Sequence, residues 1–427
     1  MALLVALLAS ALLVVGASLV VIGVVRLACV PAALVFEARQ RRADPGPVGC
    51  GPRFAVPPRV SVVVPAYEEE LLIEQCLRSI LRSDHPHLEV VCVDDGSSDG
   101  TYDRMRDVAA DDPRVRVLRQ ENAGKGAALN TGVAASSGEV LVLVDADGLF
   151  RPDTLTRLLR GFRDARVGAV CGNDRPVNLD RVLTRLLALI SHVGTGLMRR
   201  ALDVLGCLPV VSGNIGAYRR DVLDRVGPLR TDTLGEDLEL TWRVHRAGFG
   251  VTFAPDAVVY AESPSTVRGL WRQRVRWARG LLQATSLHRR MIGNPRYGAF
   301  GVYLLYNTLA QVVGPFVQVL GAAVLAVLVL VDGTDRLPAS PAGWLLLVGL
   351  PLSLALLLLA VLLDRSPGDL RQLWTVVLWP PYSALMSLVV LDAARLELGN
   401  AENRWNKLER SGTVSVPGLV EDDGPGS

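Results

Sequence analysis

Two apolar runs of this chain end in closely spaced acidic residues. The run VVCV leads into Asp94 and Asp95, and the run VLVLV leads into Asp145 and Asp147. One such cluster alone would suit an ordinary turn or a helix N-cap. Two clusters at one edge of a sheet concentrate negative charge, which is costly unless a cation lies among the carboxylates. Oxygen ligands without His or Cys indicate Mg²⁺ or Mn²⁺ rather than zinc.

A lysine lies between these two acidic clusters. The segment NAGKGAALN has small residues that permit close approach of a ligand, and Lys125 places a positive charge at the start of a predicted helix. A cation held by one or two carboxylates usually completes its shell with water and substrate phosphates, so these features indicate a diphosphate substrate. Lys125 alone would equally suit a solvated surface. The chain has no GxxxxGK[ST] loop and no GxGxxG turn after its first strand, which argues against a P-loop protein and a Rossmann dehydrogenase.

Two later segments carry further charged groups. Glu236, Asp237 and Glu239 precede a stretch rich in Leu, Trp and Val. They are either the acidic first turn that helices favour or the site of a general base that takes a proton from an attacking hydroxyl. The segment WRQRVRWAR, residues 271–279, suits either a basic helix at a membrane surface or sugar stacking with diphosphate binding. Nucleic-acid binding is disfavoured, because no wider basic patch surrounds this segment.

Short apolar runs alternate with amphipathic stretches in the middle of the chain. Strands are predicted at residues 60–64, 89–93, 115–118 and 139–144, and helices at 68–83, 98–110 and 125–135. This alternation indicates a mostly parallel sheet covered by helices on both faces. Ligands of such sheets bind beyond the carboxyl ends of the strands, which is where the paired carboxylates are predicted to lie.

The composition is that of a membrane-associated chain. Half of the residues are hydrophobic and the mean hydropathy is +0.32. Residues 1–25 are uncharged, long enough to span a bilayer, and lack the basic start of a signal peptide. Arginines follow from Arg26 to Arg59 and nothing basic precedes them, so the positive-inside rule places the next region in the cytoplasm. The six cysteines form no CxxC pair and are expected to be reduced thiols.

Three more uncharged runs occupy residues 297–331, 337–363 and 373–391. Gly314-Pro315 interrupts the first run, and Pro380-Pro381 is expected to bend or shorten the last. We predict about four spanning helices in the chain. The predicted organisation is a transmembrane anchor at 1–36, a cytoplasmic domain at 57–290, interfacial and transmembrane helices at 297–391, and a polar tail at 392–427.

Five segments in order resemble the motif series of family 2 glycosyltransferases, in particular the processive membrane branch of cellulose, hyaluronan and poly-N-acetylglucosamine synthases. These segments are VSVVVPAYEE (60–69), DDGS (94–97), DAD (145–147), GED (235–237) and QRVRW (273–277). Each segment is weak alone, but five in order that end in QxxRW are specific. The resemblance covers residues 57–290 and implies a GT-A type nucleotide-sugar-binding domain and an inverting transfer. Glu68 departs from the family pattern, in which Asn usually follows the tyrosine.

The resemblance also implies roles for individual residues. Asp237 would be the general base, and Asp147 would bind Mg²⁺ or Mn²⁺ directly within the DxD-type element. The residues implied to hold the nucleotide-sugar are Pro65, Tyr67, Glu69, Asp95, Lys125, Asp145, Asp147, Gln273, Arg276 and Trp277. The residues implied to bind the acceptor are Ser212, Gly213, Asn214 and Trp277.

The function implied by the resemblance is polysaccharide synthesis at the plasma membrane by a multi-pass enzyme. The enzyme would transfer N-acetylglucosamine or glucose from a UDP-sugar to the end of a growing β-linked polymer and assist its export. An accessory membrane or export subunit would be a further partner. The alternative is a non-processive enzyme that adds one sugar to a lipid or other membrane acceptor. A catalytically inactive scaffold is disfavoured, because the carboxylates that the chemistry requires are present.

Overall fold

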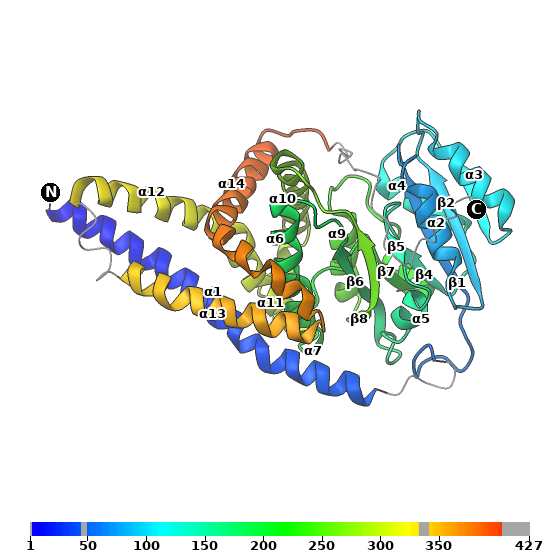
Figure 1. Ribbon diagram of the computed structural model, residues 1–427, viewed down its shortest axis with the longest axis horizontal. Helices are drawn as coiled ribbons and strands as arrows, with labels where there is room; N and C mark the ends of the chain where they lie inside the picture. The colour runs from blue at the N-terminus through cyan, green and yellow to red at the C-terminus, as the bar shows by residue number, and fades with distance from the viewer. Residues whose placement is uncertain (1, 44–48, 333–340, 404–427) are drawn as a thin grey trace, which may run out of the picture.

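The computed structural model describes residues 2–43, 49–332 and 341–403, and shows an α/β body joined to a set of long helices (Figure 1). Within this described part, eight strands form one sheet in the order β3-β2-β1-β4-β7-β6-β8-β5. The strands are β1 (Val60–Ala66), β2 (Leu88–Asp94), β3 (Val115–Arg119), β4 (Val140–Leu143), β5 (Leu149–Phe150), β6 (Val167–Pro176), β7 (Gly216–Arg219) and β8 (Gly250–Ala261).

The sheet is mixed but mostly parallel, as the sequence predicts. Strands β3, β2, β1 and β4 are parallel to one another. Strand β7 pairs antiparallel with both β4 and β6, so β6 runs in the direction of β4 and the two carboxyl ends lie at the same edge. Strand β8 is parallel to β6, and β5 is antiparallel to β8.

Helices cover both faces of the sheet, as predicted. They are α2 (Ile73–Leu81), α3 (Thr101–Asp111), α4 (Lys125–Ala135), α5 (Thr154–Leu159), α6 (Val182–Ser191), α7 (Met198–Val204), α8 (Arg220–Val226), α9 (Glu236–Arg246) and α10 (Val267–Leu287). Alternate residues of β1 pack on opposite faces. Val62 and Val64 belong to one buried cluster with Ile73, whereas Val63 belongs to a second with Leu129 and Trp242.

The helix predicted at residues 68–83 begins later, at Ile73, because of the backbone at Glu68. Glu68 has φ of 53°, a left-handed conformation that cannot be part of a right-handed helix. Its backbone N–H donates to Ser97 Oγ at 2.9 Å, which fixes the turn after β1 against the loop after β2.

We expect Glu68→Asn to raise the free energy of unfolding by about 0.5–1 kcal/mol, because Asn tolerates the left-handed region better than Glu. Thermal unfolding of the purified chain in detergent would measure the change. Glu121→Asn, at an exposed position without positive φ, is the matched control and should have no measurable effect. A Glu68 variant no more stable than the Glu121 variant would contradict the strain argument.

The apolar helices outside the sheet layers are α1 (Ala2–Arg42), α11 (Gly298–Thr308), α12 (Gly314–Asp332), α13 (Pro341–Leu363) and α14 (Trp379–Leu398). Of these, α1 and α12 extend furthest from the body, whereas α14 packs against α10 (Figure 1). Helices α1, α12 and α13 run side by side, and α1 contacts both of the others (Figure 1). In the described residues three helical stretches are long and apolar enough to span a membrane, and Pro351–Leu363 is a shorter apolar helix. The long stretches are Val20–Arg42, Pro295–Val331 and Pro367–Leu398.

The two proline positions behave differently from each other. The interruption predicted at Gly314-Pro315 is a π-helical turn, η4 (Leu309–Val313), which joins α11 to α12 without ending the helix. Of the two alternatives predicted at Pro380-Pro381, a bent or a shortened run, the structure agrees with the second, because the run is divided just before these prolines. Both prolines lie in the first turn of α14, where their missing N–H groups are not needed, and a 3-10 segment, η5 (Pro367–Leu378), precedes them. Residues 392–398 of the predicted tail continue α14, and residues 404–427 lie outside the described residues.

Candidate active site

An ammonium group enclosed by carboxylates lies at the carboxyl edge of the sheet. Lys125 Nζ, at the start of α4, is 2.7 Å from Asp145 Oδ1 after β4 and 3.1 Å from Glu236 Oε1 at the start of α9. Burial by itself would lower the pKa of Lys125, but Asp145, Glu236 and Asp237 together raise it well above its usual value. Lys125 is therefore a fixed positive charge among acids, and its predicted place near the diphosphate of the donor stays a prediction.

Asp237 lies beside this ammonium and faces the segment predicted to contact the acceptor. Its Oδ2 accepts a hydrogen bond of 3.1 Å from the backbone N–H of Gly213. A Cβ atom built on Gly213 would lie 2.8 Å from Lys125 Nζ and 3.4 Å from Asp237 Oδ2, so a side chain at this position would displace the ammonium group of Lys125. The fold therefore brings together four predicted residues from separate parts of the chain: Lys125, Asp145, Gly213 and Asp237.

Buried charges hold α9, the helix that carries Asp237. Glu239 Oε2 is 2.8 Å from Arg243 Nε, and Glu239 Oε1 is 3.0 Å from His288 Nε2. The loop before α9 is fixed by close packing, because a Cβ on Gly280 of α10 would lie 2.8 Å from Cα of Gly235. Because these contacts hold α9 and the loop before it in place, Asp237 keeps a defined position in the site.

Asp95 organises the loop that leads to Lys125. It is fully buried, and its carboxylate accepts hydrogen bonds from Gln120 Nε2 at 2.7 Å and from the backbone N–H groups of Ala123 and Gly124 at 3.0 and 2.8 Å. The loops after β1 and β2 are joined nearby, where the N–H of Glu69 donates to Thr101 Oγ1 at 2.7 Å. Contacts of Asp95, Tyr67, Glu69 and Pro65 with a nucleotide remain predictions.

Asp147 supplies a buried carboxylate two residues beyond Asp145, after the end of β4. Within the described residues no group of three or more His, Cys, Asp or Glu side chains is arranged to hold a metal ion. Hard oxygen donors with few protein ligands fit a divalent cation that takes its remaining ligands from water and substrate phosphates. The donor set of the DxD-type element is therefore compatible with the predicted Mg²⁺ or Mn²⁺.

Helix α10 carries the QRVRW segment. Trp277 is 48% exposed, and the guanidinium of Arg274 lies 4.2 Å from its ring centroid. Gln273 Oε1 is buried without a hydrogen-bond donor among the described residues. In the part of the chain that the structure describes, no hydrogen bond or ion pair joins Gln273, Arg276 or Trp277 to Asp237.

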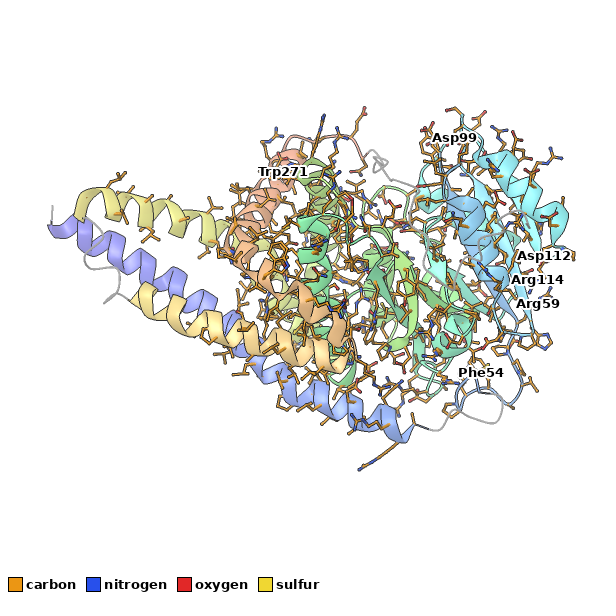
Figure 2. All side chains as sticks on the ribbon, in the orientation of Figure 1. Phe54, Arg59, Asp99, Asp112, Arg114 and Trp271 are labelled. Atoms are coloured by element: carbon orange, nitrogen blue, oxygen red, sulfur yellow. The ribbon has the colours of Figure 1, made fainter. Side chains whose placement is uncertain are left out.

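The C-terminal helix fixes α10, which the sequence did not predict. Trp271 Nε1, labelled in Figure 2, donates to Asp392 Oδ2 of α14 at 3.2 Å. Two residues beyond Trp277, the buried guanidinium of Arg279 binds Glu397 and the carbonyl oxygen of Ala401. The basic segment of residues 271–279 is equally typical of a helix at a membrane surface. The local sequence therefore does not distinguish such a helix from one that is fixed by contacts with α14.

Glu236 is the functional residue that the sequence interpretation left unassigned. Its carboxylate pairs with Lys125, as that of Asp145 does, and raises the pKa of its neighbour Asp237. The sequence signal for Glu236 was its position between Gly235 and Asp237 in the GED segment. Its partner, Lys125, is far away in the chain, so the sequence did not indicate this ion pair.

Comparison with known proteins gives three further findings. Residues 57–280 match the protein family described as "Glycosyltransferase like family 2". Poly-beta-1,6-N-acetyl-D-glucosamine synthases from Staphylococcus aureus (strain COL) and Staphylococcus epidermidis are each 30% identical over 222 residues, 52% of this chain and 54% of theirs. The chain thus spans about half the length of the curated relatives it matches. A mannosyltransferase from Pyrobaculum calidifontis, solved with GDP-Man and Mn²⁺, superposes with a TM-score of 0.62 at 27% identity, covering 91% of this chain and 100% of that one.

Proposed function

Since this chain belongs to glycosyltransferase family 2 and has a GT-A fold, we propose that it transfers a sugar from a nucleotide-sugar to an acceptor hydroxyl with inversion. The observation that carries the proposal is the meeting of Asp237, Lys125 and Asp145 around Gly213. This arrangement brings a base, a fixed cation and a carboxylate together at one point. Because Gly213 has no side chain, an acceptor can approach these groups past its backbone.

In the proposed reaction, Asp237 accepts the proton of the acceptor hydroxyl while that oxygen forms a bond to the anomeric carbon of the donor. The bond from the anomeric carbon to the diphosphate oxygen breaks, and the diphosphate leaves with the electron pair. Lys125, held by Asp145 and Glu236, lies beside the path of this developing negative charge. A divalent cation at Asp147 would neutralise diphosphate charge when bound, as Mn²⁺ accompanies GDP-Man in the Pyrobaculum structure.

We expect kcat/KM for transfer to decline as the pH falls through about 6, by about tenfold per pH unit below that value. Burial is the main cause that raises the pKa of Asp237 to about 6; Glu236 acts in the same direction and Lys125 against it. Activity is therefore fully present above this pKa, where Asp237 is ionised, and is lost below it. Initial rates across the pH range would measure the profile. A flat profile well below pH 6 would assign the base to another group.

The acceptor is proposed to be the end of a growing β-linked polysaccharide, with UDP-N-acetylglucosamine or UDP-glucose as donor. The similarity to poly-N-acetylglucosamine synthases, the QRVRW segment and the apolar C-terminal helices support this assignment. The alternative is transfer of a single sugar to a lipid or other membrane acceptor. The Pyrobaculum mannosyltransferase, solved with GDP-Man, superposes over its whole length, which makes GDP-mannose a further donor to test.

A donor panel tests the proposed function directly. Membranes containing the chain are incubated with radiolabelled UDP-N-acetylglucosamine, UDP-glucose and GDP-mannose, and the product is sized. A high-molecular-weight product from a UDP-sugar supports the polymerising enzyme, and a single labelled sugar from GDP-mannose supports the alternative. Label transfer that is the same in Asp237→Asn membranes would contradict the proposed function.

We expect Trp277→Ala to shorten the product and to lower the rate of elongation by about tenfold. An exposed indole beside an arginine offers a stacking surface for a sugar ring, and such contacts are worth about 0.5–1.5 kcal/mol. Product length at equal protein level measures the effect. Trp374→Ala, at a tryptophan that is 52% exposed on η5, is the matched control. An unchanged product in the Trp277 variant would remove the support for processive synthesis.

The chain has the features of a membrane protein, and we further propose that its α/β body faces the cytoplasm. Helix α1 ends in Arg39, Arg41 and Arg42, immediately before the body, which supports this orientation by the positive-inside rule. The plasma membrane, the multi-pass arrangement, the domain limits at 57–290 and an accessory export subunit are parts of the same proposal.

A further inference from the structure

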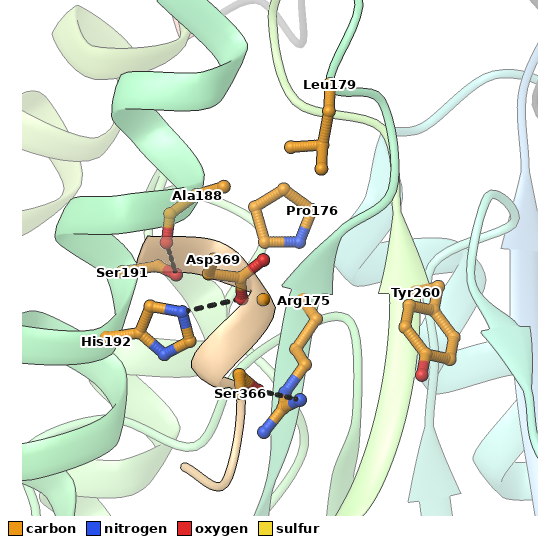
Figure 3. Close-up of a pocket in the computed structure, with 10 residues that line it drawn as sticks. Arg175, Pro176, Leu179, Ala188, Ser191, His192, Tyr260, Ser366 and Asp369 are labelled. Atoms are coloured by element: carbon orange, nitrogen blue, oxygen red, sulfur yellow. Dashed lines mark hydrogen bonds and ion pairs between the residues drawn. The ribbon is translucent and has the colours of Figure 1, made fainter. Parts of the chain in front are cut away.

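A pocket of about 280 Å³ lies beyond the carboxyl ends of β6 and β8 (Figure 3). Its walls come from the end of β6, the end of β8, helix α6 and the start of η5, so it lies between the sheet and the apolar C-terminal helices. The residues that carry the argument are Arg175, Leu179, His192, Tyr260, Ser366 and Asp369.

The polar groups of the pocket are held in fixed positions. Arg175 Nη1 donates to Ser366 Oγ at 3.0 Å and Nη2 to the carbonyl oxygen of Asp364 at 3.1 Å. Arg175 Nε is buried and has no hydrogen-bond acceptor among the described residues. His192 Nε2 lies 3.0 Å from Asp369 Oδ2 (Figure 3). The pocket therefore brings together a buried guanidinium N–H that has no acceptor among the described residues, a carboxylate and a tyrosine ring.

Charges in and behind the pocket balance. His192 Nδ1 is 2.6 Å from Asp364 Oδ2, and Arg200 binds Asp364 at 2.6 Å and Glu37 at 2.7 Å. Burial opposes protonation of His192, but its hydrogen bonds to the carboxylates of Asp364 and Asp369 raise its pKa. Arg175, Arg200 and the imidazole of His192, whose two nitrogens each lie beside a carboxylate, thus face three carboxylates, at Glu37, Asp364 and Asp369. A neutral set of donors and acceptors beside an aromatic ring favours an uncharged, hydroxyl-rich ligand over a phosphate or a metal ion.

Strand β6 connects this pocket to the candidate active site. Cys171 Sγ accepts the N–H of Ser212 at 3.4 Å, next to the Gly213 that contacts Asp237. Arg175 lies four residues further along β6, which is about 13 Å at the rise of an extended strand. Because β6 runs in the direction of β4, this path leads from the active edge towards η5 and the apolar helices.

We propose that this pocket is a sugar subsite for the acceptor, which holds a sugar unit on the membrane side of the point of transfer. The inference rests on the proposed function, because it assigns a second contact to the same acceptor. Leu179, in its rim, and Tyr260, in its wall, are then acceptor-binding residues that the sequence motifs do not include.

Two variants test the subsite in the full-length protein in detergent. Leu179→Trp fills the rim, and Tyr260→Ala removes the ring; Leu205→Trp, at an exposed leucine after α7, is the matched control. The probe is a β-1,6-linked N-acetylglucosamine pentasaccharide, added as acceptor with labelled donor. We expect the KM for the pentasaccharide to rise at least tenfold in both pocket variants, while the donor KM and the melting temperature match those of the Leu205→Trp protein.

The outcomes separate the two proposals. If the wild-type chain transfers sugar but both pocket variants keep the wild-type KM for the pentasaccharide, the subsite is wrong and the proposed function stands. If the wild-type chain transfers no sugar from any donor, the proposed function itself fails. Inorganic phosphate that competes with the pentasaccharide in the wild type but not in the pocket variants would also overturn the subsite, because it would mark an anion site.

Discussion

Asp237→Asn is expected to lower kcat for sugar transfer by about 10²–10⁴-fold, the range that a general base contributes. The amide has nearly the same shape, and its oxygen can still accept the N–H of Gly213, but it cannot take a proton. Donor affinity should therefore stay within about twofold of wild type, because binding of the diphosphate does not need that proton. Transfer of label and equilibrium binding of the donor measure the two quantities separately.

Asp232→Asn is the matched control for this variant. Asp232 lies in the loop just before α9 and pairs with Arg230 on the surface, so its loss should leave both kcat and donor affinity near wild type. Loss of donor binding in Asp237→Asn would assign Asp237 to the donor site instead of to proton transfer. Retention of full activity would remove it from the mechanism.

The parts of the fold that the sequence predicts well are those determined locally. Helix α4 begins at Lys125 and ends at Ala135 as predicted, and Gly124, with φ of 90°, directly precedes it. The two acidic clusters follow β2 and β4, and both strands are parallel to β1, so the clusters lie at the same edge of the sheet. The alternation of strands and helices in the sequence already predicts this parallel arrangement. The same reasoning fails at Glu68. The sequence predicts a helix that includes this residue, but the backbone of Glu68 is left-handed and lies outside the helix.

Contacts between distant segments account for what the sequence does not predict. The ion pair of Lys125 with Glu236 needs β4, α4 and α9 to be placed first, and each residue alone has an ordinary local explanation. The prolines of α14 show a similar limit. Proline is typical both of a kink within a helix and of its first turn, and only the observed start at Trp379 decides between them.

A buried ionic cluster lies behind the pocket lined by Arg175 and Asp369. It is the clearest case of a contact between distant segments that the sequence does not predict. Glu37 comes from α1, His192 from the π-helical turn η1 (His192–Leu197), Arg200 from α7, and Asp364 from the end of α13. All four side chains are buried, and the cluster joins the α/β body to two of the apolar helices. Charges on apolar helices are costly unless they are paired, so this cluster specifies how the helices dock on the body.

Arg200→Met is therefore expected to destabilise the protein by about 3–5 kcal/mol, the typical cost of breaking a buried ion pair from one side. Met has a similar length and keeps the packing, but it leaves Glu37 and Asp364 without their shared cation. Thermal or denaturant unfolding in detergent measures the loss, with Arg181→Met as control, because Arg181 is exposed and its pair with Asp180 is worth about 0–1 kcal/mol. The triple variant Glu37→Gln, Arg200→Met, Asp364→Asn should recover part of the stability, since it removes the uncompensated charges together with the arginine. An Arg200→Met protein as stable as the Arg181→Met protein would show that the cluster does not hold the apolar helices to the body.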